Sequence, residues 1–277
     1  MKRHPGHQRA NPVAGAAAFV WLLVIGAPLV ALISSVIQPQ SAYNANGPLS
    51  LPRSLTLSNI TTVVHSGFLG YIRNTILVSA ATVALVLLFS VPISFAVVRG
   101  RGWITRGVFR IFLLGLAIPA QAVIIPLFLI INQLGLYDTL WGVILPTAAF
   151  SMPVSVLVIS GGMREISSEL YEAMALDGAR PGKVLTGMVI PLSRSSIATA
   201  GVFAALQAWN GFLFPLIMTQ SDSTKVATLG LYDFVSTYGA DVPALLAAVL
   251  MSAVPILVVY LFARRALVAG LMGAGGK

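Results

Sequence analysis

Half of the chain's eight acidic side chains gather in one segment, residues 162–192. They are Glu165, Glu169, Glu172 and Asp177. Carboxylates on an exposed helix form charge-assisted hydrogen bonds with donor groups of a partner. The chain has no glycine-rich phosphate loop ending in Lys and Ser or Thr, and no histidine beside a serine motif. We therefore expect no catalytic residues and no enzyme activity.

Cysteine and histidine usage excludes several kinds of site. The chain has no cysteine, and its three histidines are His4, His7 and His65. Thiolate metal sites, disulfides and thiol nucleophiles are therefore excluded. Two histidines in an N-terminal tail and one in a loop do not form a zinc site. We expect this chain to bind no metal and no cofactor.

Two short amphipathic helices joined by a turn are predicted within residues 162–192. Ser168 is expected to cap the first helix. Acidic Glu169 and Glu172 in its early turns suit the positive end of the helix dipole. The residues that follow i, i+3, i+4, i+7 spacing predict one mostly apolar face: Leu170, Ala173, Met174 and Asp177.

A turn and a second helix complete the segment. Gly178 is suited to the left-handed conformation that ends a helix, and Pro181 to the first position of the next one. Pro191 is expected to break the chain before the following apolar stretch. The second helix has an apolar face of Val184, Leu185 and Met188. An amphipathic helix lying on the membrane is the alternative, but the acidic first half disfavours anionic lipid.

The elements that position this segment are long apolar stretches. The 277 residues are 57% hydrophobic and only 9% charged, whereas soluble domains carry about a quarter charged residues. Crossing a hydrocarbon core takes about 20 helical residues. The stretches lack the alternation of barrel strands, and lipid requires the backbone to bond within each segment. We predict an all-α, multi-pass protein of the plasma or inner membrane, with six transmembrane helices near residues 14–37, 74–98, 108–131, 139–160, 193–218 and 243–263.

Basic residues predict the orientation. Of the 17 Lys and Arg residues, 14 fall in alternate segments that include both ends of the chain and residues 162–192. Such an excess marks the cytoplasmic side. We expect cytoplasmic tails at 1–13 and 264–277, with the transmembrane domain at 14–263. Contact with anionic lipid head groups explains the net charge of +9 without nucleic acid.

The first apolar run follows Lys2, Arg3 and Arg9 and so resembles a signal peptide. Its length of about two dozen residues exceeds the usual apolar core of such a peptide, about 7–15 residues. We interpret it as a retained first helix.

One stretch of the acidic segment resembles a known motif. Glu172-Ala173-Met174, three residues, Gly178, nine residues and Met188-Val189-Ile190-Pro191 resemble the EAA motif of ABC-importer permeases: Glu-Ala-Ala, three residues, Gly, nine residues, Ile, any residue, Leu, Pro. Glu172, Ala173, Gly178 and Pro191 match. The departures are Met174, Met188 and Ile190, of which the last two keep a bulky apolar side chain.

Further features are similar to the carbohydrate branch of that family, the second permease of maltose-type importers. They agree in order, with the number of spans, over nearly the whole chain. They are Leu176–Ala179, Ile190–Leu192, Ala208–Phe212, and Arg264-Arg265 with the Val268–Leu271 and Ala274-Gly275 that follow.

The resemblance implies a type I ABC-importer permease fold, in which residues 162–192 are the coupling helix docked into a cytoplasmic ATPase. ATPase closure on ATP would then switch the spans between inward-facing and outward-facing states. The implied partners are a second homologous permease, two ATP-binding subunits that hold ATP and Mg²⁺, and an extracytoplasmic solute-binding protein. The implied docking residues are Glu169, Glu172, Ala173, Met174, Asp177, Gly178, Ala179 and Pro191.

The resemblance also implies that this subunit forms half of a translocation pathway, for sugars or oligosaccharides. Polar residues in the spans are candidates for its lining: Gln121, Gln207, Trp209 and Asn210. Amides could bond sugar hydroxyls and the indole could stack on a ring. Interhelical hydrogen bonds, worth about 1 kcal/mol each, and a packing or interfacial role for the indole remain alternatives.

Other functions stay open. One is an ABC permease for another solute, such as an amino acid or a polyamine. An ion-coupled secondary transporter is disfavoured, because such proteins carry carboxylates within the membrane and the acidic residues of this chain fall in predicted loops. A membrane scaffold would not need the Glu172–Pro191 pattern.

Overall fold

The computed structural model describes residues 12–48, 50, 52, 54–100, 102–236 and 239–273. Most of the two predicted tails, residues 1–11 and 274–277, therefore lies outside the described residues. The chain divides into two compact units, Met1–Ser66 with Phe234–Met251, and Gly67–Asp233 with Ser252–Lys277. Each unit is described by itself.

The first unit holds short elements around one long apolar helix. Asn59 is buried and donates hydrogen bonds to the carbonyl oxygens of Val36, at 2.7 Å, and Gln38, at 2.9 Å, which fixes the chain where the long helix ends. Val235 pairs with Ala240 in the antiparallel hairpin. The elements are α1 (Pro12–Val36), α2 (Gln40–Asn46), α3 (Ser58–His65), β1 (Val235–Ser236), β2 (Gly239–Ala240) and the start of α14 (Val242–Gly273).

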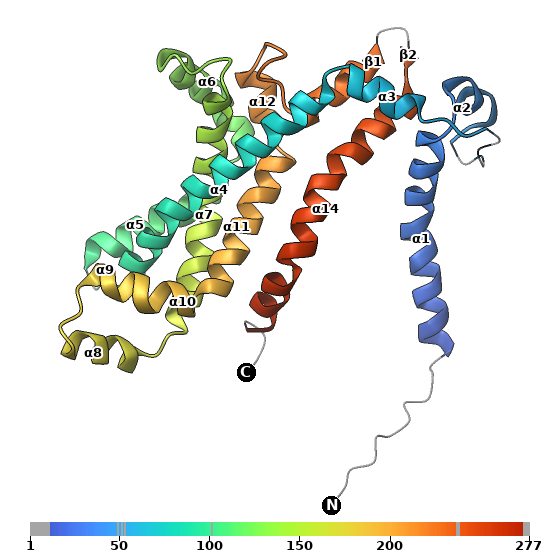
Figure 1. Ribbon diagram of the computed structural model, residues 1–277. Helices are drawn as coiled ribbons and strands as arrows, with labels where there is room; N and C mark the ends of the chain where they lie inside the picture. Colours follow the sequence, from blue (N-terminus) through green and yellow to red (C-terminus); the bar gives the residue numbers. More distant parts are fainter. Residues whose placement is uncertain are drawn as a thin grey trace, which may run out of the picture. The chain divides into compact units, whose positions relative to one another are not determined.

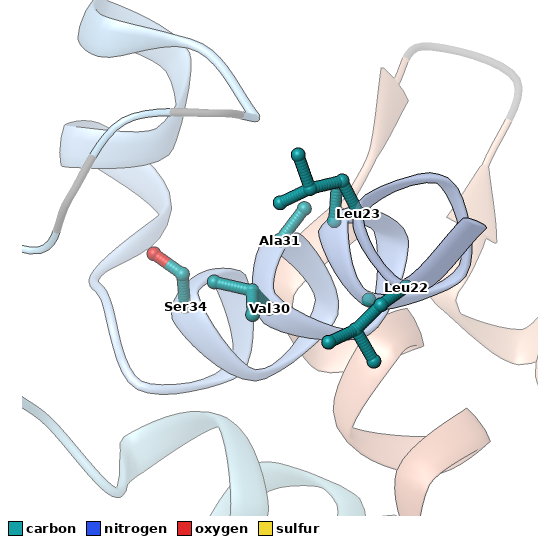
Figure 2. Close-up of a pocket in the computed structure, with 7 residues that line it drawn as sticks. Leu22, Leu23, Val30, Ala31 and Ser34 are labelled. Atoms are coloured by element: carbon teal, nitrogen blue, oxygen red, sulfur yellow. The ribbon is translucent and has the colours of Figure 1, made fainter. Parts of the chain in front are cut away.

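Helix α1 exposes its apolar side chains along most of its length. Trp21 is 67% exposed and Leu22 65%. A shallow hollow of about 410 Å³ lies along it, lined by Leu22, Leu23, Val30, Ala31 and Ser34 among others (Figure 2). Such a surface suits hydrocarbon rather than water, and α1 coincides with the predicted stretch 14–37.

The second unit is built on three helices that pack side by side: α4 (Phe68–Arg99), α7 (Leu140–Arg164) and α11 (Arg194–Trp209) (Figure 1). Small buried side chains let them approach closely, as in other membrane bundles. Ser94 of α4 donates to the carbonyl oxygen of Val156 on α7 at 3.3 Å. On α11 the packing residues include Ala200 and Ala204, both fully buried.

Shorter elements complete this unit. They are α5 (Trp103–Gly115), η1 (Ala120–Val123), α6 (Ile124–Gln133), α8 (Ser168–Leu176), α9 (Pro181–Val184), the π turn η2 (Leu185–Val189), α10 (Ile190–Leu192), α12 (Leu213–Met218), α13 (Ala227–Gly230), η3 (Leu231–Phe234, whose last residue belongs to the first unit) and the end of α14.

Two predicted spans are broken helices. The stretch 108–131 bends by 99° between α5 and the helices from Ala120 to Gln133. Pro119, which is extended with ψ 132°, has no N–H for a helical bond and disfavours helix in the residue before it. The stretch 193–218 is interrupted after Trp209 and resumes as α12. The sequence analysis predicted a span in each stretch and did not place these interruptions.

Other boundaries differ less. Helix α4 begins six residues before the predicted 74, α7 agrees with 139–160 at its start and continues to Arg164, and α14 continues to Gly273, through residues predicted as tail. Within the described residues, three helices are long and apolar enough to cross a membrane, or up to five if each bent pair is one span, and Val242–Val258 is a shorter apolar helix. The all-α class is confirmed; six spans remain a prediction.

Candidate functional site

The acidic segment begins with a well-formed helix cap. Ser167, with extended backbone, accepts a hydrogen bond from the Glu169 N–H at 3.3 Å, and Glu169 lies in the first turn of α8. The cap is therefore Ser167, not the predicted Ser168. Ser168 is already the first helical residue of α8, whereas a cap lies at the non-helical position just before the helix.

The turn after α8 is a Schellman motif. The Ala179 N–H donates to the Met174 carbonyl oxygen and the Gly178 N–H to that of Ala175, each at 3.0 Å. Gly178 has φ +66°, and its missing Cβ would meet no atom within 4 Å. The left-handed conformation predicted for Gly178 is confirmed, and the requirement for glycine is purely conformational.

The second half of the segment is one bent helical stretch. Pro181 occupies the first position of α9 as predicted, and Val184 and Val189 are buried with Leu185 and Met188 packed beside them. The break expected at Pro191 was wrong in position, because Pro191 is helical and the bend of 79° falls between Leu192 and Arg194. The Ile190 N–H donates to the Leu185 carbonyl oxygen across the π turn. This wider turn accommodates the ring of Pro191, which has no N–H to donate.

The buried face of α8 differs from the predicted one. Tyr171 is 5% exposed and Met174 packs beside it against the bundle. Leu170, expected on the apolar face, is 46% exposed, and Leu176 is 89% exposed. The sequence interpretation missed Tyr171, although its i, i+3 spacing to Met174 was the available signal.

The exposed face of α8 combines unpaired carboxylates with apolar side chains. In the described part of the chain, both ion pairs belong to Lys225, and none involves Glu165, Glu169, Glu172 or Asp177. Charge that is left unpaired beside an exposed leucine is suited to a partner that supplies donors and an apolar cleft.

Three of the four predicted pathway residues line one pocket. Gln121, Gln207 and Asn210 meet in a cavity of about 230 Å³ where the two broken helices are interrupted, with Ser151 and Phe212 among its other lining residues. Trp209, the fourth, is half-buried and is not part of this lining.

The polar side chains of this pocket bond little among themselves. Asn210 donates only to the carbonyl oxygen of Leu206 in its own helix, at 2.9 Å. Neither the Gln121 side chain nor the Gln207 side chain has a hydrogen bond to any residue that the structure describes. For these amides the interhelical hydrogen bonds proposed as an alternative are therefore absent from the described chain.

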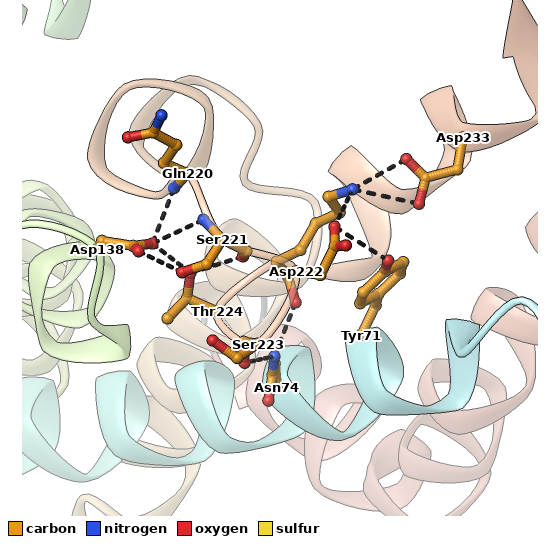
Figure 3. Close-up of polar contacts among 10 residues, drawn as sticks. Tyr71, Asn74, Asp138, Gln220, Ser221, Asp222, Ser223, Thr224 and Asp233 are labelled. Carbon is orange, nitrogen blue, oxygen red and sulfur yellow. Dashed lines mark hydrogen bonds and ion pairs between the residues drawn. The ribbon is translucent and has the colours of Figure 1, made fainter.

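A second polar network, which sequence reasoning did not find, holds residues 219–227 (Figure 3). Asp138, in the loop before α7, has φ +56° and accepts hydrogen bonds from the N–H groups of Gln220 and Ser221, at 2.8 and 3.0 Å, and from both the Ser221 and Thr224 hydroxyls. The bonds from Ser221 and Thr224, with the two backbone bonds, hold the pKa of Asp138 far below its usual range.

The same loop is tied to the start of α4. Asn74, 2% exposed, donates to the carbonyl oxygens of Ser223 and Lys225, both at 2.8 Å, and the Thr75 hydroxyl accepts from the Ala227 N–H at 2.9 Å. Lys225 pairs with Asp222 at 2.7 Å and Asp233 at 2.9 Å. Burial opposes the charge of Lys225, but the hydrogen bonds of those carboxylates outweigh it and raise the lysine pKa.

Helices broken beside a polar pocket, together with an exposed acidic segment, are features expected of a membrane transport subunit. Residues 89–267, which contain both features, match the model of the family described as binding-protein-dependent transport system inner membrane component. The chain belongs to this family. It is therefore a multi-pass inner-membrane permease of an ABC importer and not an enzyme.

Individual relatives agree over nearly the whole chain. A protein of Caldicellulosiruptor sp. (strain Rt8B.4), named as an ABC transporter permease, is 31% identical over 258 residues, 93% of this chain and 94% of the relative. An arabinooligosaccharides transport system permease of Halalkalibacterium halodurans is 30% identical, covering 93% and 96%. A chain of a bacterial ABC transporter that imports alginate has the same fold, with TM-score 0.78 and 22% identity over 95% of this chain and 99% of that one.

Proposed function

We propose that this permease carries sugars or oligosaccharides, and that α8 with the following turn is its ATPase-docking element. The observation that carries the docking role is the exposed face of α8, where Glu169 and Glu172 have no ion-pair partner among the described residues and Leu176 is 89% exposed. The Schellman turn at Gly178 holds that face at a defined angle to the second half of the segment.

The proposed partners supply what this chain lacks. Two ATP-binding subunits hold ATP and Mg²⁺, a second homologous permease forms the other half of the pathway, and a solute-binding protein delivers the solute from outside. The docking segment lies on the cytoplasmic side in this assembly. The excess of basic residues in the segments assigned to that side supports the orientation.

The pocket at the helix breaks supports a sugar as the solute. Gln121, Gln207 and Asn210 offer amide donors and acceptors, and the nearby Phe150, Phe212 and Phe214 offer ring faces. Planar amides and aromatic rings are the groups that orient a neutral, hydroxyl-rich ligand. Charged side chains, which an amino acid or polyamine would require, are absent from this lining. The name of the arabinooligosaccharide relative agrees with this choice.

A charge reversal tests the docking role. Glu172→Lys should abolish co-purification of the ATP-binding subunits and uptake of solute, because it places a cation where donor groups are expected to bind. The matched control is Glu165→Lys, which reverses an exposed charge just before α8 and outside the motif. Normal co-purification and uptake in Glu172→Lys would refute the docking role.

Uptake assays test the solute. Uptake of a labelled arabino-oligosaccharide by cells that express the complete transporter should be reduced in Asn210→Ala and Gln207→Ala, and unaffected in Asn132→Ala, an exposed amide of α6 outside the pocket. If the transporter takes up an amino acid or a polyamine and no oligosaccharide, the proposed solute is wrong and the alternative solute is correct.

A further inference from the structure

Tyr171 attaches the docking helix to the rest of the permease. It is the only buried residue of α8, all nine residues of which are described. Its ring packs into a cluster that includes Val91 of α4, Ile159 of α7 and Val189 of the π turn. Helix α8 therefore touches the bundle on one narrow face while its other faces are exposed.

Arg99 lies over the same ring. Its guanidinium carbon is 4.2 Å from the ring centroid of Tyr171, which is within cation–π range. Arg99 is the last residue of α4, where the helix dipole favours a positive charge. The contact therefore joins α8 directly to the end of a core helix.

The ring rather than the hydroxyl makes this attachment. The Tyr171 hydroxyl is buried and has no hydrogen-bond partner among the described residues. Burial raises the pKa of Tyr171, against a smaller opposite effect of Arg99, so the phenol stays neutral. Phenylalanine would keep every stabilising contact seen at this position, and leucine would keep only the apolar burial.

The opposite end of α4 holds the 219–227 loop. Helix α4 has 32 residues, about 48 Å at 1.5 Å per residue. Asn74 and Thr75, near its start, bond Ser223, Lys225 and Ala227. One continuous helix thus contacts the docking segment at one end and this loop at the other.

We propose that Tyr171 is a positioning residue whose stack with Arg99 ties α8 to α4, so that movement of the docking helix shifts the loop bonded to Asn74. The proposal rests on the docking role proposed for α8. It differs from that role because Tyr171 faces the bundle, where an ATPase cannot touch it.

A second cation–π pair provides a matched control. The guanidinium carbon of Arg164 is 5.2 Å from the ring centroid of Phe109, a contact that joins α7 to α5 and does not involve α8. Removing Arg164 therefore removes the same kind of contact at the end of a neighbouring core helix while the attachment of α8 is intact.

The experiment uses the complete transporter in lipid vesicles. Because the chain has no cysteine, Ser223→Cys can report on the loop through its rate of reaction with a thiol reagent, with and without a non-hydrolysable ATP analogue. We expect the analogue to change this rate. The change should persist in Tyr171→Phe and Arg164→Met and be lost in Tyr171→Leu and Arg99→Met, while the ATP-binding subunits still co-purify.

Several results would overturn the proposal. They are no analogue-dependent change in the otherwise unaltered protein, an undiminished change in Arg99→Met, or a loss in Tyr171→Phe equal to that in Tyr171→Leu. If the Tyr171→Leu variant does not assemble, the Arg99→Met variant decides the test, because Arg99 is exposed and its replacement should not prevent assembly. Failure of the docking role is separate, because it appears as unaltered co-purification in Glu172→Lys.

Discussion

The two ends of α4 are held in different ways. At the start, Asn74 and Thr75 belong to a polar network in which the carboxylates of Asp138 and Asp222 are bonded. At the end, Arg99 meets a single ring, and the carboxylates next to that ring on α8 have no ion-pair partner in the described chain. A network that satisfies its own charges makes a rigid loop. Helix α8, whose single buried residue is Tyr171, keeps its carboxylates available to bind another molecule.

The largest effect concerns which side of the membrane each end occupies. Ser223→Cys should react with an impermeant thiol reagent in intact cells, and Lys183→Cys only after permeabilisation, because the positive-inside pattern puts residues 162–192 in the cytoplasm. Both positions are exposed, whereas Ala227 in the same loop is 2% exposed and would react poorly. The reverse labelling pattern would show that the predicted orientation in the membrane is inverted.

A strained turn should break the docking end. Gly178→Val should cost about 1–2 kcal/mol, since a β-branched residue resists the left-handed conformation, and should strongly reduce uptake. Gly178→Asn is the control, because asparagine tolerates φ near +66°. Equal uptake by the valine variant and the unaltered protein would show that the angle of α8 does not matter.

The loop end should depend on its hydrogen bonds. Asn74→Ala leaves two carbonyl oxygens without a donor and should destabilise the loop by about 1–3 kcal/mol. Hydrogen exchange in detergent should then accelerate at residues 219–227 and remain unchanged in α8. Asn46→Ala, which removes one exposed bond to Ala42, is the control. Faster exchange in α8 as well would mean that the stability of α8 depends on the hydrogen bonds of Asn74.

The smallest effect is expected from acid. The pKa of Asp138 is lowered by its hydrogen bonds from Ser221 and Thr224, so its stabilising effect is complete above the ordinary value near 3.8 and disappears as pH falls toward the lowered one. Exchange of Ser221 and Thr224 should therefore stay slow from neutral pH to below pH 4. In Asp138→Asn, which suits φ +56° but offers one carbonyl oxygen, exchange should be faster at every pH. Loss of protection near pH 6 in the unaltered protein would contradict the assignment.

Local features were predictable where neighbouring residues decide them. Gly178 and Pro181 took the predicted conformations because a turn of this kind depends on backbone preference alone. The apolar stretches became helices for the same kind of reason. The breaks near Pro119 and after Trp209 could not be placed from the sequence, because a single proline or glycine is tolerated in many membrane helices and only the surrounding packing decides whether the helix continues.

The candidate site shows the same division. Its amides were chosen from polarity alone, and the fold brought Gln121, Gln207 and Asn210 together but not Trp209. Tyr171 was missed because its i, i+3 spacing to Met174 competes with that of Leu170 to Ala173 and Met174, and only the packing of the bundle decides which residue is buried.

The sequence by itself determined the helical class, the membrane as solvent, and the glycine turn of the acidic segment. These follow from composition and from spacings of a few residues, which act through backbone preference and desolvation. Only the tertiary structure decided that α8 buries Tyr171 under Arg99, that Asp138 anchors the 219–224 chain, and that two helix breaks enclose a polar pocket. Each of these joins residues far apart in the chain, and their energy depends on distances that no local pattern encodes.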